Sequence, residues 1–299
     1  MKRLRGIAQN HNPLVKVLEW VVLIVVFSFL LIGLWGVIWG GRSDTTALKW
    51  MQFLQSLGVF LLPAVFAAYL WSEKPWHYLH LDSRPNMKSV FFAVAIIIVA
   101  LPMINLVAYL NQQIVLPSFL HDLEEQFKAM EENAQQLIER FLQTDSVAGL
   151  IGNVLLMALI PAICEETCFR GILQRLFSGE EENRQKTTTR QHIAIWVTAC
   201  IFSLAHFQMY GFIPRMLLGA LLGYLLVWTG SLWVPIIAHF TNNACSVVAY
   251  YIVSHREGVD IDEIDTFGVG DTLWLGIVSV ILVVAMLTWY IKSQRYEKN

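Results

Sequence analysis

Several ionisable and polar side chains lie inside apolar segments in the second half of the chain. They are Glu165, Glu166, Arg170, His206, His239 and Asn243. An ionisable group in a helix that crosses a membrane costs at least ~3 kcal/mol, so its presence indicates a partner or a function. The apolar segments before residue 148 contain almost no such groups. The free-energy cost of burying ionisable groups in the membrane is therefore concentrated in one half of the sequence.

Helical spacing sorts these side chains into pairs. Glu166 and Arg170 stand four residues apart, on one face of a helix, where they can neutralise each other. Glu165 is rotated by about 100° from Glu166 and therefore points elsewhere. His239 and Asn243 are also four residues apart and project side by side. We therefore expect a neutralised pair beside a separate carboxylate.

One carboxylate, two imidazoles and one amide in a single pocket would suit hydrolysis. Such a set can activate a water molecule and stabilise a developing oxyanion. Glu165, His206 and His239 could equally bind a divalent metal such as zinc, which accepts His and carboxylate ligands and leaves a position for water. The sequence has no His-Glu-x-x-His run of the usual metalloprotease kind. It leaves both the metal-bound and the metal-free alternative open.

Two prolines stand four residues before candidate residues. Pro161 precedes Glu165, and Pro235 precedes His239. A proline inside a helix removes a backbone hydrogen bond and tends to bend the helix. Our hypothesis is that both candidates lie one turn past a kink, where helices can splay and admit water.

The elements that must position these residues are membrane-spanning helices. Of the 299 residues, 56% are hydrophobic and 15% charged, whereas a soluble domain has about 25% charged residues. The apolar blocks are long enough to span a bilayer, and backbone in lipid must satisfy its own hydrogen bonds. We predict an all-α polytopic bundle of about eight transmembrane helices, at residues 19–40, 52–71, 89–110, 148–176, 192–210, 212–229, 232–254 and 272–291.

Lysine and arginine are unevenly distributed between the two sides of this bundle. With a cytoplasmic N-terminus, 14 of them lie on the cytoplasmic side and 6 on the other. This bias predicts a multi-pass protein of the cytoplasmic membrane with both termini inside. The net charge of −2 and the absence of a basic stripe argue against nucleic acid as a partner.

A polar insert at residues 111–147 interrupts the bundle. Its apolar residues recur at helical spacing among acidic ones, which predicts an amphipathic helix on the non-cytoplasmic surface. This helix is either a solvated linker or a lid over a substrate groove. We divide the chain into N-terminal helices with the insert (1–147), a catalytic core (148–255), and an acidic loop with the last helix (256–299). Gly219 and Gly223 have the spacing that lets two membrane helices approach closely.

Three motifs in order resemble those of a known family. They are Glu165-Glu166 with Arg170, Phe202 with His206, and His239 with Asn243. This pattern resembles the CPBP family of CAAX proteases and bacteriocin-processing enzymes, also called Abi proteins, which includes the type II CAAX prenyl endopeptidases. The resemblance covers roughly residues 148–255.

The resemblance implies a role for each motif residue. Glu165 would be the base that activates water, assisted by His206 and His239. Asn243 would stabilise the oxyanion, while Glu166 and Arg170 would hold the helices in register. The substrate would be a membrane-associated or lipidated peptide or protein, as a prenylated C-terminus is for the best-known relatives.

Two other classes of function compete with an intramembrane endopeptidase. The first is a non-proteolytic immunity or scaffold protein that uses the same residues as architecture. The second is a small transporter, since buried carboxylates and histidines also mark proton paths. We find no repeated pair of broken helices of the kind that builds a transport site. Replacing Glu165 with Gln should abolish proteolysis but spare a scaffold.

Overall fold

The molecule is a bundle of helices. The structure, a computed structural model, describes residues 4–179, 188–256 and 263–296, and contains no strand within those ranges. Seven of the described helical stretches are long and apolar enough to cross a membrane. The chain is therefore an all-α, multi-pass membrane protein. Some residues on which the predicted orientation and the predicted acidic loop depend lie outside the described residues. They are Lys2, Arg3, Arg184, Lys186, Lys298 and residues 260–262.

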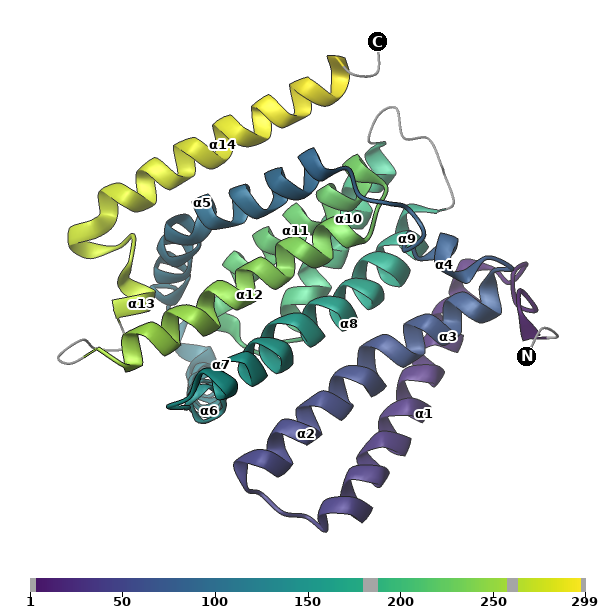
Figure 1. The fold of residues 1–299 in the computed structure, drawn as a ribbon, viewed down its shortest axis with the longest axis horizontal. Helices are drawn as coiled ribbons and strands as arrows, with labels where there is room; N and C mark the ends of the chain where they lie inside the picture. The colour runs from purple at the N-terminus through teal and green to yellow at the C-terminus, as the bar shows by residue number, and fades with distance from the viewer. Residues whose placement is uncertain (1–3, 180–187, 257–262, 297–299) are drawn as a thin grey trace.

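Figure 1 labels the α-helices in chain order. The elements are α1 (Pro13–Trp39), α2 (Thr45–Gln55), η2 (Ser56–Leu61), α3 (Leu62–Trp71), α4 (Pro75–Tyr78), α5 (Met87–Gln112), η3 (Ser118–Leu120), α6 (His121–Leu142), α7 (Val147–Val154), η4 (Leu155–Leu159), α8 (Ile160–Cys168), η5 (Phe169–Leu173), α9 (Gln174–Ser178), α10 (Thr189–Leu204), η6 (Met209–Gly211), α11 (Phe212–Thr229), α12 (Trp233–Ser254), α13 (Glu263–Thr266), η7 (Gly270–Thr272) and α14 (Leu273–Tyr296).

The helices form successive layers. α1 packs on α2 and α3 at one side, and α14 packs on α5 at the other. Between them lie α8, α10, α11 and α12 (Figure 1). Ile96, Leu225 and Val283 are buried in one core cluster that joins α5, α11 and α14. Glu165 and His239 thus lie on helices that are covered on both sides.

The predicted segment 192–210 differs from the helix that forms there. Its helix, α10, begins at Thr189 and ends at Leu204, so it has 16 residues and is about 24 Å long. A bilayer core is about 30 Å thick, so α10 is too short to cross it alone. The chain then turns and returns as α11, with Ala199 beside Gly219. His206 therefore follows the helix, in the turn, rather than lying inside it.

The two prolines do not bend their helices in the way that the kink hypothesis predicts. Pro235 lies in the first turn of α12, where a backbone N–H has no partner in the helix anyway. Pro161 is the second residue of α8, which directly follows the π-helical turn η4, where the backbone is widened. A second π-helical turn, η5, follows Cys168. The kink hypothesis is wrong for Pro235, and at Pro161 the irregularity is a π turn. Glu165 lies between two such turns, which often mark functional sites.

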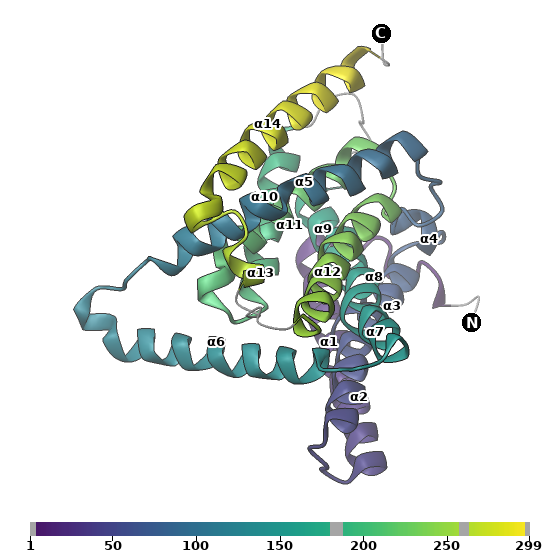
Figure 2. The same cartoon turned by 60° about the vertical axis from the view of Figure 1, so that its left-hand side comes forward.

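The polar insert contains the predicted amphipathic helix. α6 runs from His121 to Leu142 and crosses one end of the bundle at a steep angle to the other helices (Figure 2). Phe141 and Leu142 are buried, and Leu142 packs with Val247 and Tyr250 of α12. The C-terminal end of α6 therefore packs on the protein.

Candidate active site

Glu166 is the centre of a buried polar network. Its side chain is fully buried, and its Oε1 atom accepts a hydrogen bond from Nη1 of Arg170 at 2.8 Å. The other end of the guanidinium, Nη2, donates to the carbonyl of Gly219 at 2.8 Å. The predicted pairing of Glu166 with Arg170 is confirmed, and Arg170 also connects η5 to α11.

His239 is held by the same carboxylate. Its Nδ1 atom lies 2.8 Å from Oε1 of Glu166. Because an ionised carboxylate only accepts, Nδ1 carries the proton and donates it, and in the neutral ring Nε2 then bears a lone pair. This Nε2 atom faces Glu165, with 3.9 Å to its Oε2 atom. The spacing of residues did not reveal the contact with Glu166, because the two helices are distant in sequence.

Glu165 points away from the buried pair, as its helical position predicts. Its side chain keeps 13% of its surface exposed, whereas that of Glu166 keeps none. Its Oε2 atom is buried and has no hydrogen-bond partner within the described residues. A buried carboxylate oxygen without a partner is costly in an apolar surrounding. Such an atom is available for a ligand.

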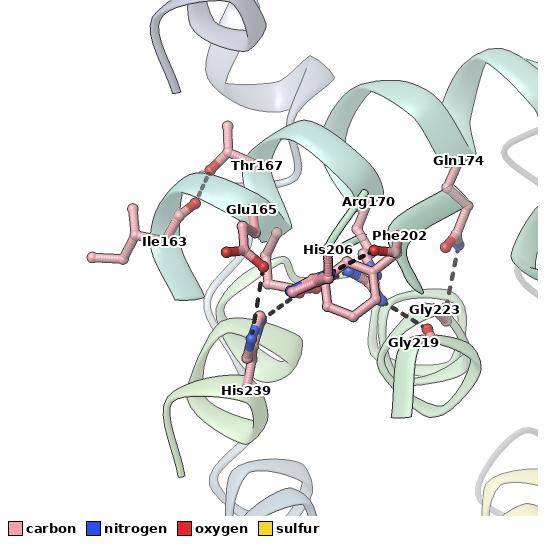
Figure 3. A network of polar contacts seen from close by, with 11 residues as sticks. Ile163, Glu165, Thr167, Arg170, Gln174, Phe202, His206, Gly219, Gly223 and His239 are labelled. Atoms are coloured by element: carbon pink, nitrogen blue, oxygen red, sulfur yellow. Dashed lines mark hydrogen bonds and ion pairs between the residues drawn. The ribbon is translucent and has the colours of Figure 1, made fainter. Parts of the chain in front are cut away.

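Phe202 brings the two histidines together. Its ring lies edge-on to both imidazoles, with centroids 5.0 Å from His206 and 5.8 Å from His239. The Arg170 guanidinium stacks over the same ring at 4.7 Å. Figure 3 shows His206 and His239 on the side of α8 to which Glu165 also points. Phe202 thus fixes the spacing between the imidazoles.

His206 presents one free ring nitrogen. Its Nδ1 atom lies 2.8 Å from the carbonyl of Phe202, which can only accept, so Nδ1 carries the proton. The lone pair of the neutral ring is then on Nε2. Both histidines therefore have the same tautomer, each fixed by a partner at Nδ1.

Asn243 lies one turn after His239 on α12 and is half-buried. Its Oδ1 atom accepts a hydrogen bond from Asn242 at 3.1 Å. The Nδ2 donors of Asn243 thereby face away from that bond. Its role as an oxyanion donor stays a prediction.

One residue that supports the site, Gln174, was not singled out from the spacing. Gln174, one turn after Arg170, donates to the carbonyl of Gly223 at 3.2 Å. A Cβ atom at Gly219 would lie 3.2 Å from the Ala199 backbone, which confirms the close approach predicted for Gly219 and Gly223. The helical spacing of Gln174 from Arg170 was the available signal.

The donor atoms suit zinc in type but not in spacing. Glu165, His239 and His206 offer a carboxylate and two imidazole lone pairs, which zinc accepts. Within the parts of the chain that are described, however, no three His, Cys, Asp or Glu side chains are arranged to hold a metal ion. The residues as placed do not fit a metal, so we derive no step through one.

The sequence of this core matches a known family. Residues 147–245 match the model for the type II CAAX prenyl endopeptidase Rce1-like family. This segment is similar to that family, and we call it the Rce1-like segment. It contains all three motifs, from Glu165 to Asn243.

A bacterial relative matches a similar length of this chain. The uncharacterized protein YpbD of Bacillus subtilis (strain 168) is 33% identical over 98 residues, 31% of this chain. The match spans 43% of YpbD, less than half of its length. No solved structure matches the chain significantly.

Proposed function

We propose that this chain is an intramembrane endopeptidase that hydrolyses a peptide bond in a membrane-associated or lipidated peptide or protein. One observation carries the proposal. The Oε2 atom of Glu165 is buried and unpartnered, and lies 3.9 Å from Nε2 of His239, within an Rce1-like segment.

The geometry favours a water molecule at this place. An ionised carboxylate and an imidazole lone pair are both acceptors, so they cannot bond to each other directly. A water molecule between them donates one hydrogen to Glu165 and the other to His239, and such bridges form across gaps of this length. The water is thereby polarised by two fixed groups.

Each residue then has a step in hydrolysis. The water oxygen attacks the scissile carbonyl carbon while Glu165 takes a proton from the water. Glu165 then delivers that proton to the leaving nitrogen. His239 and His206 assist through their Nε2 atoms, and the Asn243 amide donates to the oxyanion. Glu166, which holds His239 and Arg170, is a positioning residue.

The proposal extends to the setting of the reaction. The apolar helices place it in a membrane, and the distribution of lysine and arginine supports a cytoplasmic membrane with both termini inside. The substrate is a peptide or protein held at the bilayer by lipid or by an apolar segment.

The decisive experiment compares the termini of membrane proteins, by mass spectrometry, in cells that express wild type or Glu165→Gln at matched levels. Glu132→Gln, an exposed change on α6, is the matched control. Termini present in wild type and control but lost in Glu165→Gln would support proteolysis and identify the substrate. Identical termini, with the deletion phenotype rescued by Glu165→Gln, would overturn the proposal in favour of a scaffold.

A further inference from the structure

His206 lies in a short turn that cannot fix its own shape. Only residues 205–208 separate α10 from η6. Phe207, the neighbour of His206, has φ of +54° and is 69% exposed. A residue with a side chain rarely adopts this left-handed conformation, so surrounding contacts must stabilise it. The position of His206 therefore depends on what holds the turn.

Arg215 of α11 holds the turn from the inside. Its Nη1 and Nη2 atoms donate to the side-chain and backbone oxygens of Gln208, at 2.7 and 2.9 Å. Its Nε atom donates to the carbonyl of Gly211 at 3.2 Å. A Cβ atom at Gly211 would overlap the guanidinium, so the glycine makes room for it. The rigid fork of an arginine suits such a multiple contact.

Asn111, at the end of α5, holds the far end of the same turn. Its Nδ2 atom donates to the carbonyl of Met209 at 2.9 Å. Its Oδ1 atom accepts from the backbone N–H of Ile213 at 2.9 Å. The turn is thus fixed where η6 passes into α11.

The amphipathic helix α6 contacts the turn from the outside. Oε1 of Glu131 accepts from Nε2 of Gln208 at 3.2 Å. Its Oε2 atom is buried. Glu131 and Arg215 therefore hold Gln208 from opposite sides, and we call these contacts the grip on the turn. This grip lies two residues from His206.

We propose that Arg215, Gln208 and Glu131 are positioning residues for His206. Through Glu131, α6 then contributes to the geometry of the site. This inference rests on the proposed function. α6 lies outside the Rce1-like segment at 147–245. A helix that acted only as a solvated linker would not need a buried carboxylate against the turn.

Loss of the grip should slow the reaction. We expect Glu131→Ala to reduce the rate of Glu165-dependent cleavage about 10-fold and Arg215→Ala about 100-fold, which does not exceed the ~100-fold lower end of what an acid–base group contributes. Glu131→Gln keeps an oxygen that accepts from Gln208 and should retain most activity. The matched control, Glu132→Ala on the exposed face of α6, should have no effect.

A spin label tests the turn without any substrate. The label is attached to Phe207→Cys in the full chain in lipid vesicles, after its four native cysteines are replaced by serine or alanine. We expect Glu131→Ala and Arg215→Ala to increase the mobility of the label, and Glu131→Gln or Glu132→Ala to leave it unchanged. The same label at exposed Ser246 on α12 should not respond, which separates a local release from unfolding.

The two readouts distinguish the possible failures. If Glu165→Gln has no effect on cleavage while the label still responds, the proposed function fails and the grip on the turn remains. Unchanged label mobility in Glu131→Ala and Arg215→Ala would overturn the inference, whatever the protease assay gives. Where cleavage depends on Glu165, equal rates for Glu131→Ala and Glu132→Ala would also overturn it.

Discussion

The Nδ1 atom of His239 lies 2.8 Å from Oε1 of Glu166, the oxygen that also accepts from Arg170. One carboxylate oxygen therefore fixes an imidazole from α12 and a guanidinium from the same α8–η5 stretch. Glu166 does more than neutralise Arg170, because it also sets which nitrogen of His239 carries a proton. The two adjacent glutamates thus have separate roles. Glu166 orients the His239 ring, and Glu165 faces the ligand.

Glu166→Gln should reduce catalysis while keeping the size of the side chain. The amide oxygen can still accept from both the imidazole and the guanidinium, but it is neutral and therefore holds them more weakly than the carboxylate does. We expect the cleavage rate to fall about 10- to 100-fold, as for other residues that orient a histidine. The rate of Glu165-dependent cleavage at matched amounts of folded protein measures this. A rate equal to wild type would show that His239 needs no such partner.

Arg170→Ala should destabilise the bundle. It leaves the buried carboxylate of Glu166 without its charge partner and the carbonyl of Gly219 without its donor. Breaking a buried ion pair in this way costs about 3 to 5 kcal/mol. Unfolding in mixed micelles should show the loss, and Arg170→Lys, which keeps the charge on a single nitrogen, should recover part of it. Equal stability of wild type and Arg170→Ala would contradict the buried network.

Local spacing was sufficient to predict much of this site. The pairing of Glu166 with Arg170 and the separate direction of Glu165 follow from the geometry of one helix. The contact of His239 with Glu166 was not predictable in this way, because it depends on how α8 and α12 pack. That His206 comes together with the others was expected, but its place in a turn was not.

The errors at helix ends have a physical cause. The run 192–210 is apolar beyond Leu204, so hydropathy alone extends the helix. Its true end depends on Arg215 and Asn111, which bond to the turn from α11 and α5. The π turns before and after Glu165 likewise have no hydropathy signal. Tertiary contacts decide these features, and single-sequence patterns do not contain them.

Gly219→Ala should separate α10 from α11. A Cβ atom there would lie 3.2 Å from Cα of Ala199 and from the Phe202 ring, so the backbone has to move. Overpacking of this kind costs about 1 to 3 kcal/mol. Gly36→Ala on α1 is the control, since a Cβ atom there meets no neighbour. We expect a lower unfolding midpoint and slower cleavage only for Gly219→Ala, and equal behaviour of both variants would contradict the close packing.

The grip of α6 on the turn should depend on pH. Burial raises the pKa of Glu131 above its ordinary value, while Arg215 opposes that shift. A carboxyl group whose pKa is raised in the folded state favours folding in its protonated form, so the contact should strengthen as pH falls through that pKa and weaken as pH rises. A spin label at Phe207→Cys should become less mobile on acidification. The dependence should vanish in Glu131→Gln, and its persistence there would assign it to another group.

The metal question has a direct measurement. The donors Glu165, His206 and His239 suit zinc, but their arrangement holds no preformed set of three ligands. We therefore expect the purified chain to retain well below one equivalent of zinc by elemental analysis, and a chelator to leave Glu165-dependent cleavage unchanged. Stoichiometric zinc in wild type that is lost in both Glu165→Gln and His239→Ala would contradict this. It would show that the three side chains close around a metal, and that Glu165 acts as a ligand rather than as a base alone.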